Sequence, residues 1–583
     1  MSHFRQQLAE RQRPDDDGSR RWIFVPYDQL TDAIGPLSRM EPSEVGIVMV
    51  ESDWKAARRP YHRQKLAYVL ANMRHFALEQ ASRGVAVRYA HDDRRYGVVL
   101  RGLAEELGGL TVMRPAEREL RVDVAELVDD GLLEVVDHEG WLTSYEQFRA
   151  SQSGLPWRMD AFYRHIRRET GVMMEDGAPV GGQYSFDGEN REFWPGEPPA
   201  AVAPVFEPDA VTREVADLIA ERFDDHPGEV DLAHLPATRE DAERFWRWAT
   251  ENCMELFGPY EDAMSRKSRT IFHTRISSLL NLHRLLPERV VDDVLAMDIP
   301  RNSKEGFVRQ VLGWREFMNH VHRATDGFRV MPEGARVDEP SVADGPGDGG
   351  YAGWSGEAWE SSTGDDVGIH GGAAPNVLGA DAPVPPAFWG ERSGLECLDE
   401  VVEGVWEEGY SHHITRLMVL ANIATLLDVE PRALTDWFWV AYTDAYDWVV
   451  EPNVLGMGTF GLGEFFTTKP YVSGSNYIDK MSDYCGECAF DPGEDCPLKS
   501  MYWAFLERHE EELSSNNRMR LMYGNLRRRS DDRKAEDAAV YAKVRQILGR
   551  GEAVEPGDLV FAAPTSITPS GSSLPFHSPA SFA

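Results

Sequence analysis

The stretch EVGIVMVESDWKAARRPYHRQKLAYVLANMRHFALEQASRGVAVRYA (44–90) decides the fold of the N-terminal part of the chain. It opens with an apolar run typical of a buried strand and closes with a second such run at 85–90. Between them, residues 61–84 carry apolar side chains at helical spacing and end on Gly84, a residue that commonly terminates helices. Strands separated by a helix predict a parallel sheet.

The same alternation continues on both sides of this stretch. WIFVPY (22–27) predicts another buried strand, and short apolar runs alternate with amphipathic helices up to about residue 140. We therefore predict an α/β domain with a Rossmann-like parallel sheet over residues 21–140. No G-x-G-x-x-G follows the first strand, so a glycine loop for binding a dinucleotide is not predicted.

A second, helical domain is predicted from residue 211 to residue 550. The chain has 583 residues, which is too long for one core. Thr238 with acidic residues in the following turn is typical of a helix start. Four further segments have helical periodicity: 269–287, 303–323, 394–427 and 431–450. Strand-like runs are nearly absent here, which predicts an all-α domain.

Four other segments are predicted to lack a core of their own. Residues 1–20 and 551–583 are expected to be disordered, and 141–210 to be a polar connector between the domains. Residues 331–383 are rich in Gly, Asp, Ser and Pro, and cannot bury enough apolar surface to offset the entropy of ordering. We expect an acidic, flexible insertion there.

The composition is strongly acidic. The formal net charge is −36, and only nine residues are Lys. We interpret this as a halophilic surface, hydrated and screened by strong salt, with a GC-rich genome that favours Arg as the alternative. Such a charge repels nucleic acid unless a local basic surface exists, for which 164–168, 266–269 and 527–529 are candidates. No apolar run approaches the roughly 20 residues of a membrane helix, so a cytoplasmic protein is expected.

Four cysteines predict an inorganic centre. Cys485, Cys488 and Cys496 form C-x2-C-x7-C, and Cys397 lies far upstream. Four thiolates suit either zinc or an iron–sulfur cluster. Disulfides are the weaker alternative, because no secretory signal is recognisable. Cys253 lies in a helical pattern and is expected to be a small buried residue.

Several motifs together resemble the photolyase/cryptochrome family. The resemblance covers roughly residues 21–545 and is greatest to the iron–sulfur bacterial branch, the deoxyribodipyrimidine photolyase-related proteins, which include prokaryotic (6-4) photolyases and related cryptochromes. The motifs are FGPYEDAM (257–264), VRQVLGWREF (308–317), YSHHITRLM (410–418), TDAYDWVVEPNVLGMGTF (443–460) and TTKPYVSGSNYIDKMSDYCGEC (467–488). The gap from Cys488 to Cys496 is shorter than is usual in the family.

The resemblance implies a [4Fe–4S] cluster on Cys397, Cys485, Cys488 and Cys496, and FAD in the helical domain. HTRIS (273–277) offers hydroxyl and backbone N–H groups for a diphosphate, and Arg416 with Asp444 resembles the ion pair beside the flavin. The resemblance does not identify the residue that faces flavin N5; the candidates are Val450, Glu451 and Asn453. The implied FAD contacts are Tyr260, His273, Thr274, Arg275, Ser277, Gln310, Trp314, Arg315, Arg416, Asp444, Tyr446 and Asn453.

His412 and His413 are the implied catalytic residues. Repair of a (6-4) lesion needs a proton donor, and histidine titrates near neutral pH. Neighbouring helix positions point about 100° apart, so only one of the two should face the lesion, and the resemblance implies His413. Electron supply to the flavin is implied to run through Trp437, Trp389 and Tyr446.

The resemblance implies one further ligand site and the overall function. A lumazine-type antenna is expected near Lys55, with Glu51 and Asp53 close by and with Tyr27, Asp28 and Gln29 on the first strand; another pigment or none is the alternative. The implied activity is light-driven repair of (6-4) photoproducts by a monomer that flips the lesion out of UV-damaged DNA in the nucleoid. The alternatives are a cryptochrome photoreceptor and a cyclobutane-dimer photolyase.

Overall fold

A five-stranded parallel sheet forms the N-terminal domain. The structure is a computed structural model, and it describes residues 2–12, 20–335 and 372–560. The strand order is β3-β2-β1-β4-β5. The strands are β1 (Arg21–Phe24), β2 (Val45–Ser52), β3 (Ala86–Asp92), β4 (Leu110–Met113) and β5 (Leu133–Val136). Every residue of β2 is buried, which explains its continuous apolar sequence and confirms the predicted α/β class.

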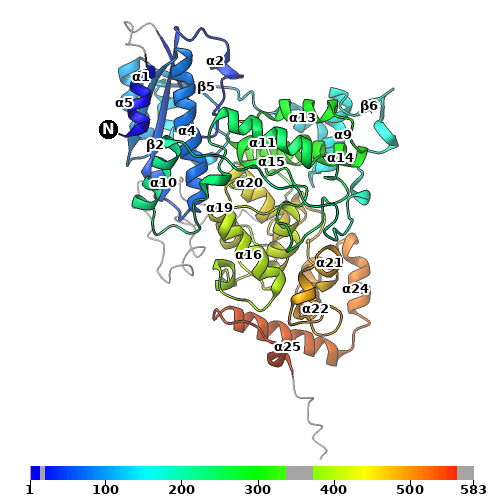
Figure 1. Ribbon diagram of the computed structural model, residues 1–583. Coiled ribbons are helices and arrows are strands. Elements are labelled where there is room, and N and C mark those ends of the chain that lie inside the picture. Colours follow the sequence, from blue (N-terminus) through cyan, green and yellow to red (C-terminus); the bar gives the residue numbers. More distant parts are fainter. Residues whose placement is uncertain (1, 13–19, 336–371, 561–583) are drawn as a thin grey trace, which may run out of the picture.

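Helices cover both faces of this sheet (Figure 1). Helix α4 (Arg63–Arg83) joins β2 to β3, and α5 (Tyr96–Leu107) joins β3 to β4. The connection from β2 to β3 runs toward the edge of the sheet, and the connection from β3 to β4 runs back across it. Because such crossovers are right-handed, the two helices lie on opposite faces of the sheet. Helix α4 ends on Gly84 at φ 90°, as its sequence predicts.

The N-terminal residues correct the prediction of disorder over 1–20. Residues His3–Arg11 form helix α1, which begins with the Ser2 hydroxyl accepting from the backbone N–H of Arg5. Phe4 and Leu8 are buried in the core of the sheet domain, and the Phe4 ring lies 4.6 Å from that of Tyr89. Two apolar residues one helical turn apart were the signal for this helix, because they lie on one face.

The C-terminal part is helical, as predicted, and its core also contains part of the segment predicted as a connector. Phe148 of α8 (Tyr145–Ser151) and Phe162 of α9 (Met159–Thr170) pack on Phe317. The other helices of at least five residues after residue 200 are α10 (Ala210–Arg222), α11 (Arg239–Asn252), α12 (Ser277–Asn281), α13 (Pro287–Ala296), α14 (Arg301–Val308), α15 (Glu316–Ala324), α16 (Glu396–Glu408), α18 (Asn422–Leu426), α19 (Pro431–Ala441), α21 (Ser475–Met481), α22 (Pro497–Arg508), α24 (Arg520–Leu526) and α25 (Asp531–Leu548).

Two further boundaries differ from the prediction. Most of the expected acidic insertion, 336–371, lies outside the described residues, but the chain from 372 onward is packed: Ala373 is fully buried and Ala382 bridges to Val429. In the expected C-terminal tail, Val554 is buried and donates its N–H to the carbonyl of Ser393. Residues 561–583 lie outside the described chain.

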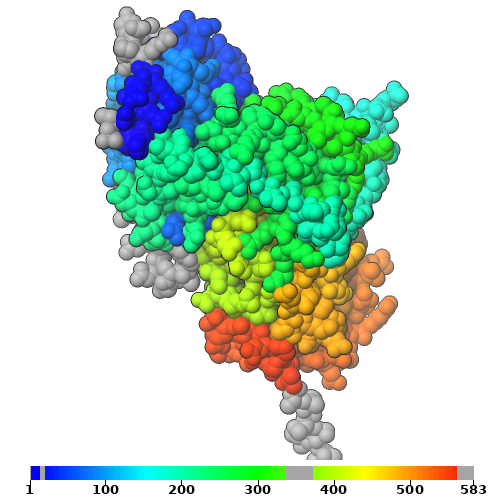
Figure 2. All heavy atoms as spheres, in the orientation of Figure 1, coloured from blue at the N-terminus to red at the C-terminus, as the bar shows by residue number. Residues whose placement is uncertain are grey.

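The two domains pack directly against each other (Figure 2). Lys65 on α4 donates to the carbonyls of Trp439 and Ala445, at 2.9 and 2.5 Å. The backbone N–H groups of Arg118 and Glu119 donate to the Asp447 carboxylate. No helix in the described part of the chain is both long and apolar enough to cross a membrane.

Three π-helical segments interrupt the helical domain within the motifs quoted above. They are η4 (Arg309–Arg315), η7 (Arg416–Ala421) and η8 (Glu451–Gly458). Single π turns interrupt helices most often at functional sites. All three segments contribute side chains to one internal cavity.

Candidate active site

A cavity of about 320 Å³ lies inside the helical domain. Its walls come from the 273–281 segment, from η4, η7 and η8, and from residues around 410 and 444. The walls bring together most of the predicted FAD contacts and the predicted proton donor. These residues are His273, Thr274, Arg275, Ser277, Gln310, Trp314, Arg315, His413, Arg416, Asp444 and Asn453.

An ion pair forms one wall. Arg416 binds the Asp444 carboxylate through both terminal nitrogens at 3.0 Å, and the Ser277 hydroxyl donates to the same carboxylate at 2.6 Å. Burial alone would raise the pKa of Asp444, but Arg416 and the hydroxyl hold it below its ordinary value. Arg416 also lies 4.0 Å above the Tyr442 ring. The wall therefore keeps a fixed, charged pair at the cavity.

Arg315 contributes a guanidinium to another wall, and not all of its N–H groups are hydrogen-bonded. Its guanidinium lies 4.2 Å above Trp141 and 3.4 Å from Glu316, while its Nε and Nη2 are buried without a hydrogen-bond partner. Burial lowers the pKa of Arg315 to about 10. A buried donor without a partner is costly. Arg315 places a cation in the wall of the cavity, which suits an anionic cofactor such as FAD.

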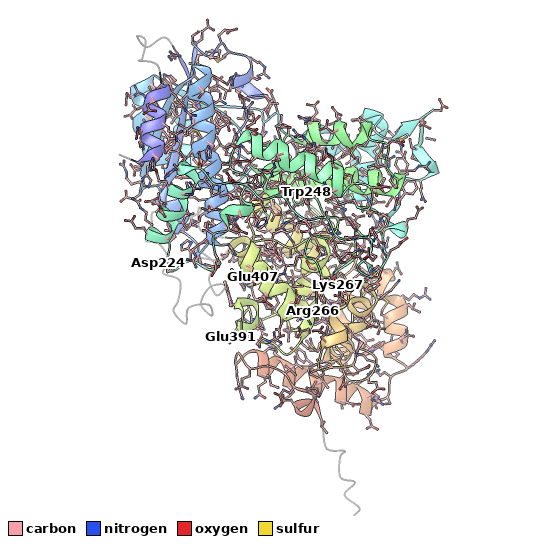
Figure 3. All side chains as sticks on the ribbon, viewed as in Figure 1. Asp224, Trp248, Arg266, Lys267, Glu391 and Glu407 are labelled. Carbon is pink, nitrogen blue, oxygen red and sulfur yellow. The ribbon has the colours of Figure 1, made fainter. Side chains whose placement is uncertain are left out.

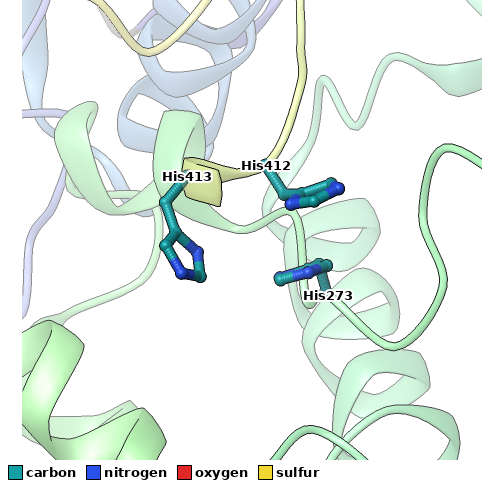
Figure 4. Close-up of side chains that lie close together, drawn as sticks. All are labelled: His273, His412 and His413. Carbon is teal, nitrogen blue, oxygen red and sulfur yellow. The ribbon is translucent and has the colours of Figure 1, made fainter. Parts of the chain in front are cut away.

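Three histidines meet at the edge of the cavity (Figure 4). The rings of His273 and His412 are stacked at 4.2 Å, with 10° between their planes. His413 lies beside them, with its ring 5.6 Å from that of His273 and its Nε2 3.8 Å from the Asp262 carboxylate. The His413 side chain is 42% exposed, whereas His412 is buried and does not line the cavity. Of the two adjacent histidines, only His413 can meet a substrate.

Two predicted FAD contacts lie elsewhere. Tyr260 packs on Phe272 at 5.6 Å, outside the cavity. Tyr446 stacks on Tyr27 of the sheet domain at 6.3 Å and lines a different, smaller cavity. Sequence order misleads here: Tyr446 follows Asp444 by only two residues, but Asp444 lies in a turn and the two side chains line different cavities.

The structure separates the three candidates for the position facing flavin N5. Val450 and Asn453 both line the cavity. Glu451 does not, because its carboxylate is buried in bonds with Arg432 and His322, at 2.7 and 2.8 Å. Asn453 is thus the polar member of the three that a bound ligand can reach.

The predicted tryptophans belong to a chain of three rings. Trp437 is fully buried, and its ring lies 6.0 Å from that of Trp406 on α16. Trp406 in turn stacks on Trp389 at 5.4 Å, and both line a surface hollow of about 650 Å³. Sequence reasoning missed Trp406, since nothing local distinguishes it from a core residue of an amphipathic helix. Tyr446 has no place in this row of rings.

The four cysteines converge although they come from separate elements. Cys397 lies in α16, Cys485 in η10 (Tyr484–Glu487), Cys488 directly after it, and Cys496 caps α22. All four line one small cavity. Burial, and then the thiols of the other three, raise the pKa of Cys397 well above its ordinary value. Within the described chain, no three of the sulfurs lie mutually within 4.8 Å.

The short loop before Cys496 is closed by one aspartate. The Asp491 carboxylate accepts from the N–H groups of Gly493 and Glu494, at 2.7 and 3.0 Å. The Asp491 carbonyl accepts from the N–H of Cys496 at 2.9 Å. A side chain that bonds the backbone two and three residues on forms a tight turn. The unusually short gap between Cys488 and Cys496 therefore still returns the last thiol to the group.

Most of the residues predicted to hold an antenna already bond to other residues of the protein. A cavity of about 60 Å³ lies between the two domains and is lined by Tyr27, Lys55 and Tyr446. Lys55 pairs with Glu117 and Glu119, at 3.2 and 2.7 Å. The other predicted acids are engaged too: Glu51 by Arg74 and Tyr89, and Asp53 by His91 and Arg222; Gln29 bonds the carbonyl of Met113.

Asp28 beside this cavity makes stability depend on pH. Both of its carboxylate oxygens are buried without a partner, and burial, followed by the charge of Glu117, raises its pKa to about 7. A raised pKa means that ionisation opposes folding, so this stability is present below pH 4 and is lost as the pH rises through 7. We expect Asp28→Asn to stabilise the protein by roughly 2–4 kcal/mol at pH 8.

The measurement for Asp28→Asn is urea unfolding of both proteins at pH 8 and at pH 5. The advantage of the variant should shrink at the lower pH, where the wild-type carboxyl is largely protonated. An equal effect at both pH values would contradict the assignment.

This architecture, a parallel sheet domain packed on a helical domain with an internal cavity, is that of the photolyase/cryptochrome class. A cryptochrome from Synechocystis sp. PCC6803 superposes with a TM-score of 0.52 at 13% identity, over 84% of this chain and 93% of that one. A bacterial class III photolyase from Agrobacterium tumefaciens superposes with a TM-score of 0.49 at 15% identity, over 91% and 99%.

Sequence comparison gives the family. The chain is 31% identical to a (6-4) photolyase from Agrobacterium fabrum over 539 residues, which are 88% of this chain and 96% of that protein. Residues 23–235 match the family model described as deoxyribodipyrimidine photo-lyase-related protein. The chain belongs to the deoxyribodipyrimidine photolyase-related family.

Proposed function

We propose that this protein is a (6-4) photolyase, a lyase that uses light to repair (6-4) pyrimidine–pyrimidone photoproducts in DNA. The observation that carries the proposal is one accessible histidine, His413, on the wall of a cavity that also holds the Arg416–Asp444 pair. The likeness to a (6-4) photolyase over almost its whole length supports the choice of lesion.

Membership of the photolyase/cryptochrome class implies FAD, and the cavity has groups that suit it. The free donors of Arg315 and the backbone and hydroxyl groups of 273–277 would hold the diphosphate, and Arg416 with Asp444 would lie beside the isoalloxazine. Bound FAD supplies light absorption and the electron for the lesion. The protein's own part is to exclude water, orient the lesion and provide a proton.

His413 is the proposed proton donor. Its imidazole is exposed at the cavity edge and is oriented by Asp262, which in turn accepts from the Tyr477 hydroxyl at 3.0 Å. The imidazole can donate a proton to the lesion and accept it back at the end of the reaction.

DNA must approach a surface on which the basic residues already have partners. Arg266 and Lys267 lie near the middle of the molecule (Figure 3). Arg266 pairs with Glu396 and Glu487, at 2.9 and 2.8 Å, and Arg269 pairs with Glu407. DNA phosphates must displace these carboxylates, and exposed pairs are weak enough to exchange. The flipped dinucleotide would then enter above the cavity. A monomer in the nucleoid is part of the proposal.

An iron–sulfur cluster is proposed for the four cysteines. A tetrahedral zinc ion with Zn–S bonds of about 2.3 Å holds its sulfurs about 3.8 Å apart. The described sulfurs are spread more widely than that, which favours a larger [4Fe–4S] cluster. A lumazine-type antenna is not part of the proposal, because Glu51 and Asp53 are already paired.

We expect Cys485→Ala to remove the cluster and to destabilise the C-terminal helices. The centre ties α16 to α22 across about a hundred residues, and losing such a link frees a long loop. Iron content, absorbance near 400 nm and thermal unfolding would measure the loss. Cys253→Ala is the matched control, because that thiol is buried elsewhere. Unchanged iron content in Cys485→Ala would contradict the ligand assignment.

We expect Trp406→Phe to slow flavin photoreduction by at least about tenfold, because it removes the ring that links buried Trp437 to Trp389. The measurement is the rate of flavin bleaching under blue light with an external reductant. Trp503→Phe, which changes a tryptophan outside this row, is the control. An unchanged rate in Trp406→Phe would show that electrons take another route.

The proposed function is tested with two oligonucleotides, one carrying a (6-4) lesion and one a cyclobutane dimer, under light with reduced FAD in high salt. Repair of the (6-4) substrate alone is expected. Repair of the dimer alone would move the protein to the cyclobutane-dimer photolyases. No repair of either, with normal photoreduction, would favour a cryptochrome photoreceptor.

A further inference from the structure

The three histidines at the cavity edge form a set of nitrogen donors that the proposed reaction does not use as a set. One ring nitrogen from each of His273, His412 and His413 lies within 4.8 Å of the other two. They come from two distant parts of the chain, the loop before α12 and the residues around the start of α17. In the described chain no other group of three His, Cys, Asp or Glu side chains is as close.

Two of the three rings have free nitrogens in the protein interior. Nε2 of His273 and Nδ1 of His412 are buried and have no hydrogen-bond partner, and these residues are only 5% and 4% exposed. Buried polar atoms are nearly always bonded, so two free nitrogens side by side indicate a missing partner.

The protonation of the buried rings suits a metal. Burial, followed by the neighbouring histidines, keeps His412 neutral by lowering its pKa well below the ordinary value. Burial also lowers the pKa of His273 to about 3. Neutral imidazole is the form that binds metal, so no proton need be displaced from these two rings.

We propose that His273, His412 and His413 bind a divalent transition-metal ion of the zinc class, and that the bound ion blocks repair by occupying the His413 imidazole. Three imidazoles are a usual set for zinc, copper or nickel, whereas magnesium and calcium prefer oxygen. The site is open on the side of His413, where the fourth ligand would be water. The block on repair rests on the proposed function, but the metal site does not.

The three ring nitrogens must move closer together when the metal ion binds. A tetrahedral ion with bonds of about 2.0–2.1 Å holds its nitrogens about 3.3 Å apart. The parallel His273 and His412 rings cannot both point at one ion, so one of them must turn. Because these two nitrogens make no hydrogen bonds, they do not fix either ring in place. The exposed His413 ring can also move toward the ion. Asp262 lies close enough to His413 to orient that ring without binding the ion itself.

The test is calorimetric titration of the dark holoenzyme, with FAD and the cysteine centre loaded, using Zn²⁺ in excess Mg²⁺. Magnesium occupies the acidic surface and leaves imidazoles free. One zinc per chain is expected. His413→Ala, which changes an exposed residue and should fold, and His273→Ala should each weaken binding on the order of tenfold or more. His234→Ala, an exposed histidine in another part of the chain, should not change it.

The outcomes separate the metal site from the proposed function. Zinc that binds His413→Ala as tightly as wild type, or no uptake by wild type, overturns the site. In the wild type, zinc should stop (6-4) repair reversibly while flavin photoreduction continues, and a chelator should restore repair. Zinc binding that depends on the histidines in a protein without repair activity keeps the metal site and contradicts the proposed function instead.

Discussion

Replacing His413 with Ala is expected to lower the rate of (6-4) repair on the order of 10²–10⁴-fold. His413 is the only one of the two adjacent histidines that reaches the cavity, and no other described histidine is both there and exposed. His273, the other histidine in the wall, is buried and held neutral by a pKa of about 3. It cannot donate a proton at neutral pH.

The measurement is single-turnover repair of a (6-4) oligonucleotide in light, with DNA binding and flavin photoreduction followed in parallel. Both of the latter should stay near wild type in His413→Ala, because the ring contacts neither the tryptophan row nor the Arg416–Asp444 pair. Asp262→Asn should give a smaller loss, since it only weakens the orientation and charge of the donor. Repair at the wild-type rate in His413→Ala would exclude the proton-donor role.

Replacing Asp444 with Ala is expected to destabilise the protein by about 3–5 kcal/mol and to deplete bound FAD. The variant leaves the Arg416 guanidinium at the cavity without its carboxylate and the Ser277 hydroxyl without its acceptor. The pKa of Asp444 is held down by these partners, so the stability that it provides is present above about pH 4 and is lost on acidification through the lower folded pKa.

Urea unfolding and the flavin-to-protein absorbance ratio measure both effects. Asp444→Asn keeps the shape and an acceptor for Ser277, so it should lie between wild type and Asp444→Ala. Asp224→Ala, at an exposed position (Figure 3), should change stability by less than about 0.5 kcal/mol. Full FAD content in Asp444→Ala would show that the ion pair has no part in holding the cofactor.

The predictable parts of the fold are those with a local pattern. The apolar run of β2 predicted a strand buried on both faces, and Gly84 predicted the end of α4. Helix α1 was missed because Phe4 and Leu8 are only two apolar residues in a polar segment, and their burial depends on the sheet domain. The connector was misjudged in the same way, because Phe148 and Phe162 become core residues only when they meet Phe317.

The candidate site, like the fold, was predictable only in part. Motif resemblance located most of the cavity wall, including Arg416, Asp444 and His413. It placed Tyr446 with them, although that ring stacks on Tyr27 of the sheet domain. It also gave no reason to join Trp406 to Trp437 and Trp389, which lie on different elements of the fold. The periodicity of a buried segment does not show which of its sides will contact which neighbouring element.

The sequence by itself determined the α/β and all-helical domains and the family, because periodicity, composition and motifs are read from the sequence alone. Only the tertiary structure decided that His412 is buried against His273 while His413 is exposed, and that Tyr446 faces the sheet domain. It also showed that Glu51 and Asp53 are already paired. These features depend on contacts between separate elements of the fold, where packing and charge neutralisation choose among side-chain directions that the local sequence leaves equally open.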